Sequence, residues 1–423
     1  MTAATRHLVP CKPGLFAERS CPKCGADGPQ ALGTVFPGIH ILGAYACRAC
    51  GYRFYHDLPV GFAVDYDVAI GMDDGALHNP KGVSEWVHVP LMEGFRAKSD
   101  DEVRIERRVL RPCKRVVLLN ALDFLYGHVL LKLWNAQYYL DAHPDLGLVL
   151  MIPRSFEWLV PEGVAEVWLV DQRLSQAHGW FKSIDRQVQE FISSYDEVWL
   201  GRGYAQPDKA GLDIERFTGV KPFPIESFVS EPPRVTIVLR EDRLWYRTPL
   251  HKLKHRALRR IGLKRIGDAY FRWDQQRMAM AALRQAQRAV PGLTATIVGL
   301  GDASAACPGV EDLRTRRMDA DTERRWCRAY ARSQVVIGVH GSNMLLPTAL
   351  AGGAIEILPH DRLGNLAQDV AHRRRDVLLL FLYRFLDEFA GPHEVAMHLV
   401  SMLKDFALFQ RNNIVNPPIH DGR

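Results

Sequence analysis

The 423-residue sequence predicts an α/β fold, with two Rossmann-like domains behind a small cysteine-rich domain. Two observations predict it. Short apolar runs alternate with helix-length segments in two stretches, which is the pattern of strands and helices in a parallel sheet. Four of the eight cysteines form two Cys-x-x-Cys pairs ahead of both stretches. A chain of this length is also long for a single core and favours several domains.

The paired cysteines have the spacing of a zinc ribbon: Cys21, Cys24, Cys47 and Cys50. Two intervening residues let both sulfurs of a pair reach one ion, and the glycine after each pair opens the turn. Disulfides or redox pairs are the alternative, disfavoured because no secretory signal is recognisable. Four thiolates leave no open coordination position, so we expect zinc with a structural role.

The first α/β stretch begins with a strand at Lys114–Asn120 and a helical pattern over Ala121–Leu140. Further strands are predicted at Leu148–Ile152, Val167–Val170 and Val198–Leu200. Four prolines between residues 222 and 233 indicate a linker, after which the strand pattern restarts at Val235. The expected domains are a zinc ribbon over 1–55, a connector over 56–113, and Rossmann-like domains over 114–230 and 231–423.

The strand Val335–Val339 ends in the turn His340-Gly341-Ser342-Asn343. Such a turn lies at the carboxyl edge of a parallel sheet, where open α/β folds bind ligands. Small residues allow backbone N–H groups to approach a phosphate, and the next helix directs its positive end there. The following strand carries Glu356 inside an apolar run, where a carboxylate needs a partner.

The second stretch, Val235–His360, resembles the carboxyl-terminal half of GT-B glycosyltransferases. The nearest resemblance is to the family of plant xylan arabinosyl- and xylosyltransferases and the EGF-domain O-GlcNAc transferase. The motifs that carry it are His340-Gly341-Ser342, Glu356-Ile357-Leu358-Pro359, and the arginines Arg240, Arg243 and Arg247 after the first strand. Ser342-Asn343 departs from the small apolar residues usual in that family.

The resemblance implies a glycosyltransferase of polysaccharide biosynthesis, which moves a hexose or pentose from a nucleotide-sugar to a glycan or lipid-linked acceptor. It implies inversion and no catalytic metal. His340 and the amides of Gly341–Asn343 would hold the donor phosphates. Arg240 and Arg243 would neutralise the diphosphate, and Glu356 would accept hydrogen bonds from donor hydroxyls. The domain over 114–230 would bind the acceptor, and the domain over 231–423 the nucleotide-sugar.

An acceptor hydroxyl also needs a catalytic base. Asp123 and His128 follow the strand that ends at Asn120, and Asp123 is the stronger candidate because it is nearer the strand's carboxyl end. Either residue could instead be a solvated polar group on a helix face.

The net charge of +6 fits anionic ligands such as nucleotides but is too small to indicate a nucleic-acid-binding protein. Residues 26–46 contain no Lys or Arg, so we expect the ribbon to bind no nucleic acid. The basic amphipathic segment 250–265 predicts either a peripheral membrane contact or a helix packed on its own domain. The expected location is the cytoplasm, and the first of these alternatives would add association with a membrane.

Two other functions remain open from the sequence. One is a pyruvyl or other group transferase acting on a glycan with the same two-sheet architecture. The other is a non-catalytic zinc-ribbon binding protein with a degenerate transferase body. A methyltransferase is disfavoured because no glycine-rich strand end with a downstream acid stands out early in the chain.

Overall fold

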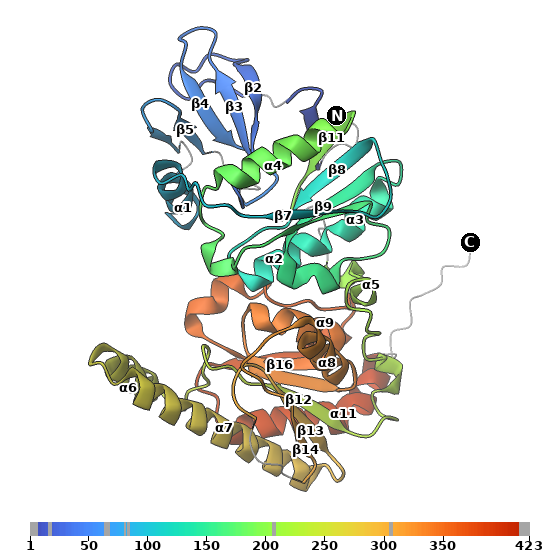
Figure 1. Ribbon diagram of the computed structural model, residues 1–423. Coiled ribbons are helices and arrows are strands. Elements are labelled where there is room, and N and C mark those ends of the chain that lie inside the picture. Colours follow the sequence, from blue (N-terminus) through green and yellow to red (C-terminus); the bar gives the residue numbers. More distant parts are fainter. Residues whose placement is uncertain are drawn as a thin grey trace. The chain divides into compact units, whose positions relative to one another are not determined.

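Two parallel sheets form in different parts of the chain (Figure 1). They belong to two units, Met1–Asp208 and Lys209–Arg423. The computed structural model describes residues 7–15, 19–62, 68–79, 82, 85–204, 209–303 and 308–413.

The parallel sheet of the first unit has the strand order β1-β11-β8-β9-β10-β7. Its four central strands are mutually parallel: β11 (Glu197–Gly201), β8 (Arg115–Asn120), β9 (Gly147–Pro153) and β10 (Glu166–Val170). Antiparallel strands form the edges: β1 (Leu8–Lys12) and β7 (Ile105–Val109). The four strands predicted in this stretch are therefore confirmed. The order of the parallel strands reverses between β8 and β11, which makes that point a switch point of the sheet.

The helices of this sheet are α2 (Tyr126–Trp134), α3 (Ala136–Ala142) and α4 (Lys182–Ser193). The prediction of one helix over 121–140 is therefore wrong at its start and in its continuity. Residues 121–125 form a turn in which Asn120 Oδ1 accepts a hydrogen bond from Leu122 N. The break falls at Asn135, whose Nδ2 donates to Leu131 O and to Gly203 O across the unit.

A second, antiparallel sheet precedes the first parallel one in the chain. Its strands are β2 (Gln30–Val35), β3 (Leu42–Ala46), β4 (Arg53–Asp57), β5 (Ala69–Gly71) and β6 (Leu77–His78). The helix α1 (Glu85–Arg96) follows it. We call this the zinc-ribbon sheet, because the four paired cysteines lie on its loops.

The zinc-ribbon sheet and the first parallel sheet share one hydrophobic core. Phe36, Ile39 and Ile41 from the former belong to the same buried cluster as Leu118 and Met151 from the latter. A hydrogen bond also links the two parts, because the backbone N–H of Phe36 donates to the carboxylate of Asp185 on α4. The zinc-ribbon sheet is thus an integral part of the first unit.

The sheet of the second unit has the order β14-β13-β12-β15-β16-β17, and every pair is parallel. Its strands are β12 (Arg234–Val238), β13 (Thr294–Val298), β14 (Val310–Asp312), β15 (Val335–Val339), β16 (Gly353–Leu358) and β17 (Tyr383–Asp387). Numbered along this unit, the order is 3-2-1-4-5-6, which is that of a doubly wound Rossmann sheet with its switch point between β12 and β15.

Seven α-helices of the second unit are described: α5 (Ile214–Thr218), α6 (Pro249–Arg260), α7 (Lys264–Ala289), α8 (Ala320–Ala331), α9 (Leu345–Leu350), α10 (Leu378–Leu382) and α11 (Pro392–Asn413). Helix α8 begins after Asp319, whose side chain accepts a hydrogen bond from Thr322 N at 2.9 Å and caps the helix. Short 3₁₀ turns complete both units at Arg154–Leu159, Leu174–Gln176, Lys209–Gly211, Ile225–Ser227, Ser342–Met344 and His360–Asn365.

Helix α6 projects from the second unit together with the first turns of α7 (Figure 1). The helix is held by its one buried side chain, His255, whose ring bonds to Tyr246 and to Asp268 on α7. Two leucines of the helix, Leu250 and Leu253, are 57% and 61% exposed. Leu258 lies against α7, where a Cβ at Gly267 would be 3.1 Å from Leu258 Cβ. The apolar side of α6 is therefore only partly packed on its own domain.

The predicted α/β fold with two Rossmann-like sheets is confirmed. The domain boundaries at residues 55, 113 and 230 stay predictions. None of the described helices combines the length and the apolar character that a bilayer crossing requires.

Candidate functional site

The switch point of the second sheet brings the predicted donor residues together. Strand β15 ends at Val339, and the chain turns at once through His340 and Gly341 into the 3₁₀ turn Ser342–Met344. Gly341 has φ +146°, a conformation that other residues rarely adopt. A Cβ at this position would lie 1.5 Å from Arg243 Nη1. The turn therefore requires glycine because the Arg243 guanidinium lies directly against it.

His340 and Glu356 form a fully buried pair. His340 Nδ1 lies 2.6 Å from Glu356 Oε2, and both side chains are 0% exposed. Burial raises the pKa of Glu356, and the hydrogen bond from His340 opposes that rise. His340 Nε2 and Glu356 Oε1 are buried atoms that have no hydrogen-bond partner in the described part of the chain. Such atoms are rare in folded proteins and call for a partner such as water or a ligand.

Positive charge gathers beside this pair. Arg243 Nη1 donates to His340 O at 2.9 Å. Burial lowers the pKa of Arg243, and the charges of Arg362 and Arg240 lower it further. Arg240 is itself paired with Asp242, through Nε–Oδ1 and Nη2–Oδ2 distances of 2.7 and 2.6 Å. The cluster thus holds an excess of positive charge that an anion would relieve.

Ser342 and Asn343 lie where the sequence predicts, but the helix that follows the turn is short. Asn343 Nδ2 donates to Val339 O at 3.3 Å, whereas its buried Oδ1 has no partner. The 3₁₀ turn leads into the six-residue α9. Its dipole is correspondingly small, so the arginines supply most of the positive field here.

A cavity of about 250 Å³ opens beside Arg240, at the carboxyl ends of β12, β13 and β14. Its polar and aromatic lining residues are Arg240, Glu241, Arg272, Trp273, Asp302, Arg314 and Arg316. Each of its arginines pairs with a carboxylate, as Arg272 does with Glu241 at 2.5 Å and Arg316 with Asp302 at 2.5 Å. The cavity is therefore polar but close to neutral, in contrast with the neighbouring Arg243 cluster.

Sequence reasoning did not find Arg272, Trp273, Arg314 and Arg316. They come from the middle of α7 and from loops after β14, and only the fold brings them together. The one sequence signal nearby was Gly299-x-Gly301, which alone is too weak to indicate a site.

The first unit places Asp123 and His128 at the switch point of its own sheet. Asp123 is 0% exposed, and its carboxylate lies 2.8 Å from Lys132 Nζ and 3.5 Å from His128 Nδ1. Burial favours the neutral acid, but the charges and hydrogen bonds of Lys132 and His128 together outweigh burial and lower the pKa of Asp123. His128 is the more accessible of the two candidate bases, with a side chain 19% exposed. Lys132, fully buried, was not anticipated from the sequence.

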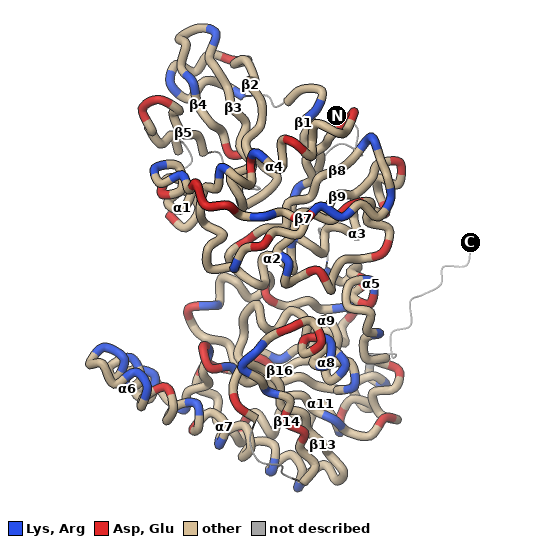
Figure 2. Tube along the Cα trace, in the orientation of Figure 1, with Lys and Arg blue, Asp and Glu red and all other residues tan. Residues whose placement is uncertain are grey.

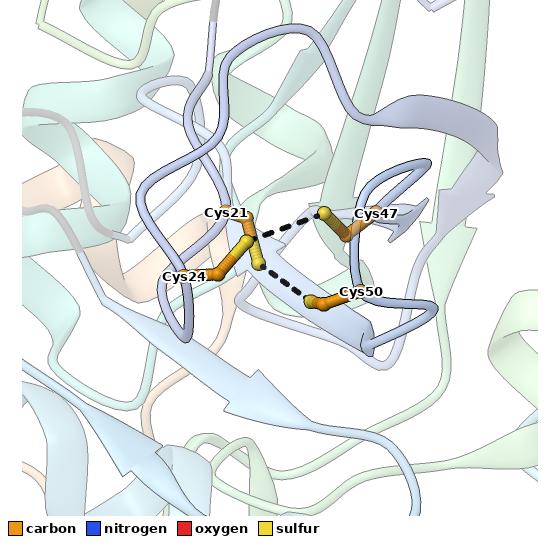
Figure 3. Close-up of side chains that lie close together, drawn as sticks. All are labelled: Cys21, Cys24, Cys47 and Cys50. Carbon is orange, nitrogen blue, oxygen red and sulfur yellow. Dashed lines mark hydrogen bonds between the residues drawn. The ribbon is translucent and has the colours of Figure 1, made fainter.

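The four paired cysteines form one cluster at the edge of the zinc-ribbon sheet (Figure 3). Their sulfurs all lie within 4.8 Å of one another, with Cys21–Cys50 at 3.8 Å and Cys24–Cys47 at 3.6 Å. A tetrahedral zinc with bonds of about 2.3 Å needs sulfurs about 3.8 Å apart, so the cluster fits that ion.

The local backbone supports metal binding as predicted. Gly25 and Gly51 have φ +75° and +74°, and each donates its N–H to the first cysteine carbonyl of its pair. The N–H groups of Cys50 and Ala49 hold the pKa of Cys47 down to about 7. The thiolate form of Cys47 is therefore accessible near neutral pH, whereas hydrogen bonds with the other cysteines raise the pKa of Cys24 to about 12.

Comparison with known proteins adds three distant structural resemblances. The first is the ADP-heptose LPS heptosyltransferase II of E. coli, with a TM-score of 0.37, 10% identity, and coverage of 69% of this chain and 99% of that one. The second is the E. coli heptosyltransferase WaaC with ADP (TM-score 0.32, 12% identity, 70% and 98%). The third is a putative UDP-N-acetylglucosamine 2-epimerase from Listeria monocytogenes (TM-score 0.28, 9% identity, 70% and 66%).

No family model and no curated protein matches the sequence. The structural scores all lie below 0.5, so the fold and the site rest on the strands and side chains of this chain. The narrower resemblance to plant xylan arabinosyl- and xylosyltransferases stays a prediction.

We expect the purified protein to hold one zinc per chain and Cys47→Ser to lose it. Structural zinc contributes about 10–16 kcal/mol of binding energy in small zinc domains. Its loss should lower the first thermal unfolding transition by about 10 °C or more, at about 2–4 °C per kcal/mol. Elemental analysis measures the zinc content, and calorimetry measures the unfolding transition. Cys113→Ala, outside the cluster, is the control and should keep the metal. A fully loaded Cys47→Ser protein would contradict the assignment.

Lys132→Met should destabilise the first unit by about 3–5 kcal/mol, because it leaves the Asp123 carboxylate buried without its partner. Urea unfolding measures the loss. Lys182→Met removes an exposed pair with Asp100 and should cost about 1 kcal/mol or less. The double variant Asp123→Asn/Lys132→Met should be more stable than Lys132→Met alone.

The same pair predicts a pH dependence. Because the folded pKa of Asp123 is lowered, its contribution to stability is complete above the usual value of 3.8 and is lost as the pH falls towards the folded value. The stability difference between wild type and the double variant should therefore shrink only in acid. A difference independent of pH down to about 2 would contradict the lowered pKa.

Proposed function

We propose that this protein is a glycosyltransferase that moves a sugar from a nucleotide-sugar to a hydroxyl acceptor. One observation carries the proposal. At the switch point of a doubly wound sheet, a buried His340–Glu356 pair with unpaired polar atoms lies beside a glycine turn and an arginine with excess positive charge. Such an edge suits a ligand with hydroxyl groups and a diphosphate.

The donor diphosphate would lie against Arg243 and the N–H groups of the turn. Among the described residues, the Arg243 guanidinium donates a hydrogen bond to the backbone carbonyl of His340, and its other interactions are with charges at longer range. It can therefore pair with a phosphate in two-point geometry. Arg240 would also help to neutralise the diphosphate, once its ion pair with Asp242 is partly broken. As the sugar leaves, these groups would stabilise the negative charge on the departing diphosphate, without a catalytic metal.

The neighbouring cavity would hold the nucleoside. Its volume of about 250 Å³ is below that of a site for a whole drug-sized ligand and suits a part of the donor. Trp273 is 51% exposed at its wall and offers a face for a base, and the paired arginines can bind hydroxyl groups. Glu356 Oε1 and His340 Nε2, the unpaired atoms of the pair, would accept hydrogen bonds from hydroxyl groups of the donor.

The first unit would bind the acceptor and supply the base. His128 is the better base because the pKa of Asp123 is lowered, and Asp123 would orient its ring. The acceptor oxygen would attack the anomeric carbon while the bond to the diphosphate breaks. The acceptor proton would pass to His128, and the configuration at the anomeric carbon would invert. Zinc on the four cysteines would hold the zinc-ribbon sheet and take no part in this step.

Saturating ADP, UDP or GDP should raise the unfolding temperature of the second unit by several degrees, since a ligand at 100 times its Kd stabilises by about 2.7 kcal/mol. Gly341→Ala should weaken that binding at least tenfold, because its Cβ would displace Arg243. Gly292→Ala is the control, because Gly292 also has a positive φ, of +80°, but open surroundings. The measurement is thermal shift, followed by titration calorimetry.

His340→Ala should abolish sugar transfer while far-UV circular dichroism stays unchanged. The mass of the product distinguishes a transferred sugar from a pyruvyl group. Stability unaffected by all three nucleotides would refute the proposed function. Full turnover by His340→Ala would remove His340 from the site.

We further propose that α6 and the start of α7 contact an anionic membrane surface. Residues 249–267 contain seven Lys or Arg and no acid, and Figure 2 shows this basic character along α6. Large apolar side chains stand exposed among them: Leu250, Leu253, Ile261, Leu263 and Ile266, at 43–68%. Basic and exposed apolar groups on one helical projection suit adsorption to anionic lipid.

Vesicles of phosphatidylcholine with phosphatidylserine should therefore sediment the protein, and vesicles of phosphatidylcholine alone should not. Each basic residue near the surface contributes about 1 kcal/mol, so Arg259→Gln/Arg260→Gln should weaken binding about thirtyfold. Leu408→Gln, an exposed leucine on α11, is the control. Equal binding to both vesicles, or none, would exclude this contact.

A further inference from the structure

The strands β3 and β4 form a hairpin whose two ends carry different chemistry. Ala46 pairs with Arg53 at one end, and the turn between them holds Cys47 and Cys50. Leu42 pairs with Asp57 at the other end, where His40 lies two residues before the strand. The hairpin therefore has a metal cluster at its turn and a His–Asp pair at its open end.

The open end lies at the carboxyl edge of the first parallel sheet. Asn120, the last residue of β8, donates from Nδ2 to Gly38 O at 2.8 Å. Phe181 N donates to Pro37 O at 3.0 Å from the other side. Because Asp123 follows Asn120 by three residues, the segment before His40 is fixed beside the candidate base of the first unit.

His40 and Asp57 repeat the arrangement of His340 and Glu356. His40 Nδ1 lies 2.6 Å from Asp57 Oδ2, with the residues 3% and 1% exposed. Among the residues that the structure describes, His40 Nε2 and Asp57 Oδ1 are buried and have no hydrogen-bond partner. A buried polar atom left unpaired costs about 1–3 kcal/mol, so a purely structural pair would be expected to satisfy both.

A second histidine, His178, faces the same edge. The ring of His178 stacks on Phe124, with centroids 3.7 Å apart, and its Nδ1 is also buried and unpaired. Burial lowers the pKa of His178, which keeps it neutral, while the charge of Asp123 acts in the opposite direction. His40 also acts on this ring, so the two histidines and Asp123 lie within electrostatic reach of one another.

Aromatic rings lie around His40 and His178. The Phe62 ring contacts His40 at 5.1 Å, Phe124 at 5.9 Å and Trp86 at 5.6 Å between centroids. Trp86 is 51% exposed and connects this buried group to the surface. Flat apolar faces with a few fixed polar atoms are what a sugar ring needs, since its C–H face stacks and its hydroxyls hydrogen-bond.

We propose that the zinc-ribbon sheet supplies part of the acceptor site: His40 accepts a hydrogen bond from a hydroxyl of a saccharide acceptor, and Asp57 positions the His40 ring. A carboxylate at Nδ1 fixes the tautomer in which Nε2 carries the lone pair. This inference rests on the proposed glycosyl transfer, because that function requires a hydroxyl acceptor in the first unit. It adds His178 and the rings of Phe62 and Trp86 as the walls of the site.

The test uses the full-length protein with ¹³C,¹⁵N-labelled histidine. Maltotriose, cellotriose, chitotriose and mannotriose are added one at a time at millimolar concentration, without nucleotide. At least one should shift the imidazole signals of His40 and His178 and leave those of His143 unchanged. His143 is the matched internal control, because it is also buried with an unpaired Nε2 but precedes β9 at the opposite edge of the sheet.

The variant His40→Asn should weaken binding of that saccharide at least tenfold, and His143→Asn should leave it within twofold. Asp57→Asn should change the ¹⁵N shifts of His40 to those of a different tautomer mixture and weaken binding about threefold. A role for Asp57 in stability alone would leave the saccharide affinity of the folded variant unchanged.

No shift at His40 or His178 with any of the four saccharides would overturn the inference, as would unchanged affinity of His40→Asn. The wild-type spectra decide the matter even where a variant fails to fold. Failure of the proposed function is distinct, because it appears as a lack of stabilisation by nucleoside diphosphates in the second unit. Saccharide shifts without nucleotide binding would refute the transferase and retain a saccharide site.

Discussion

The chemistry of both units depends on how a buried carboxylate obtains a hydrogen-bond partner. Glu356 lies on a strand buried along its whole length, where an unpaired charge would cost several kcal/mol. His340 meets that need from the end of the neighbouring strand, and the bond in turn fixes the orientation of its ring. The consequence is a ring nitrogen held at the sheet's edge with no partner of its own. In the first unit, His40 provides the buried carboxylate of Asp57 with a hydrogen-bond partner in the same way.

The elements with strong local patterns could be predicted from the sequence. Apolar runs that end in polar or glycine residues predicted β8, β9, β15 and the turn at His340, because a strand buried on both faces leaves little freedom in composition. Glu356 was found because a carboxylate inside such a run needs an explanation. The cysteine cluster was found because metal ligation imposes its own spacing.

Residues that only the fold brings together could not be predicted. Lys132 lies on a helix with apolar neighbours, and only its distance to Asp123 explains its burial. His40 and Asp57 are separated from Asp123 by more than sixty residues and belong to a different sheet. Periodicity identified α6 as a helix but not its buried side, which is marked by His255 and its bonds to Tyr246 and Asp268, while Leu250 and Leu253 are exposed. A hydrophobic stripe thus identifies a helix but not the face that is covered.

The shared core of the first unit limits how this architecture can arise and change. Phe36, Ile39, Leu58 and Val60 fill space against the apolar residues of β8 and β9 rather than forming a core of their own. A chain shortened to start after these residues would expose one side of that sheet to water and lose the carbonyl that Asn120 binds. The cysteine-bearing segment is therefore no interchangeable cassette. Recombination that moved it to another protein would have to carry the sheet with it.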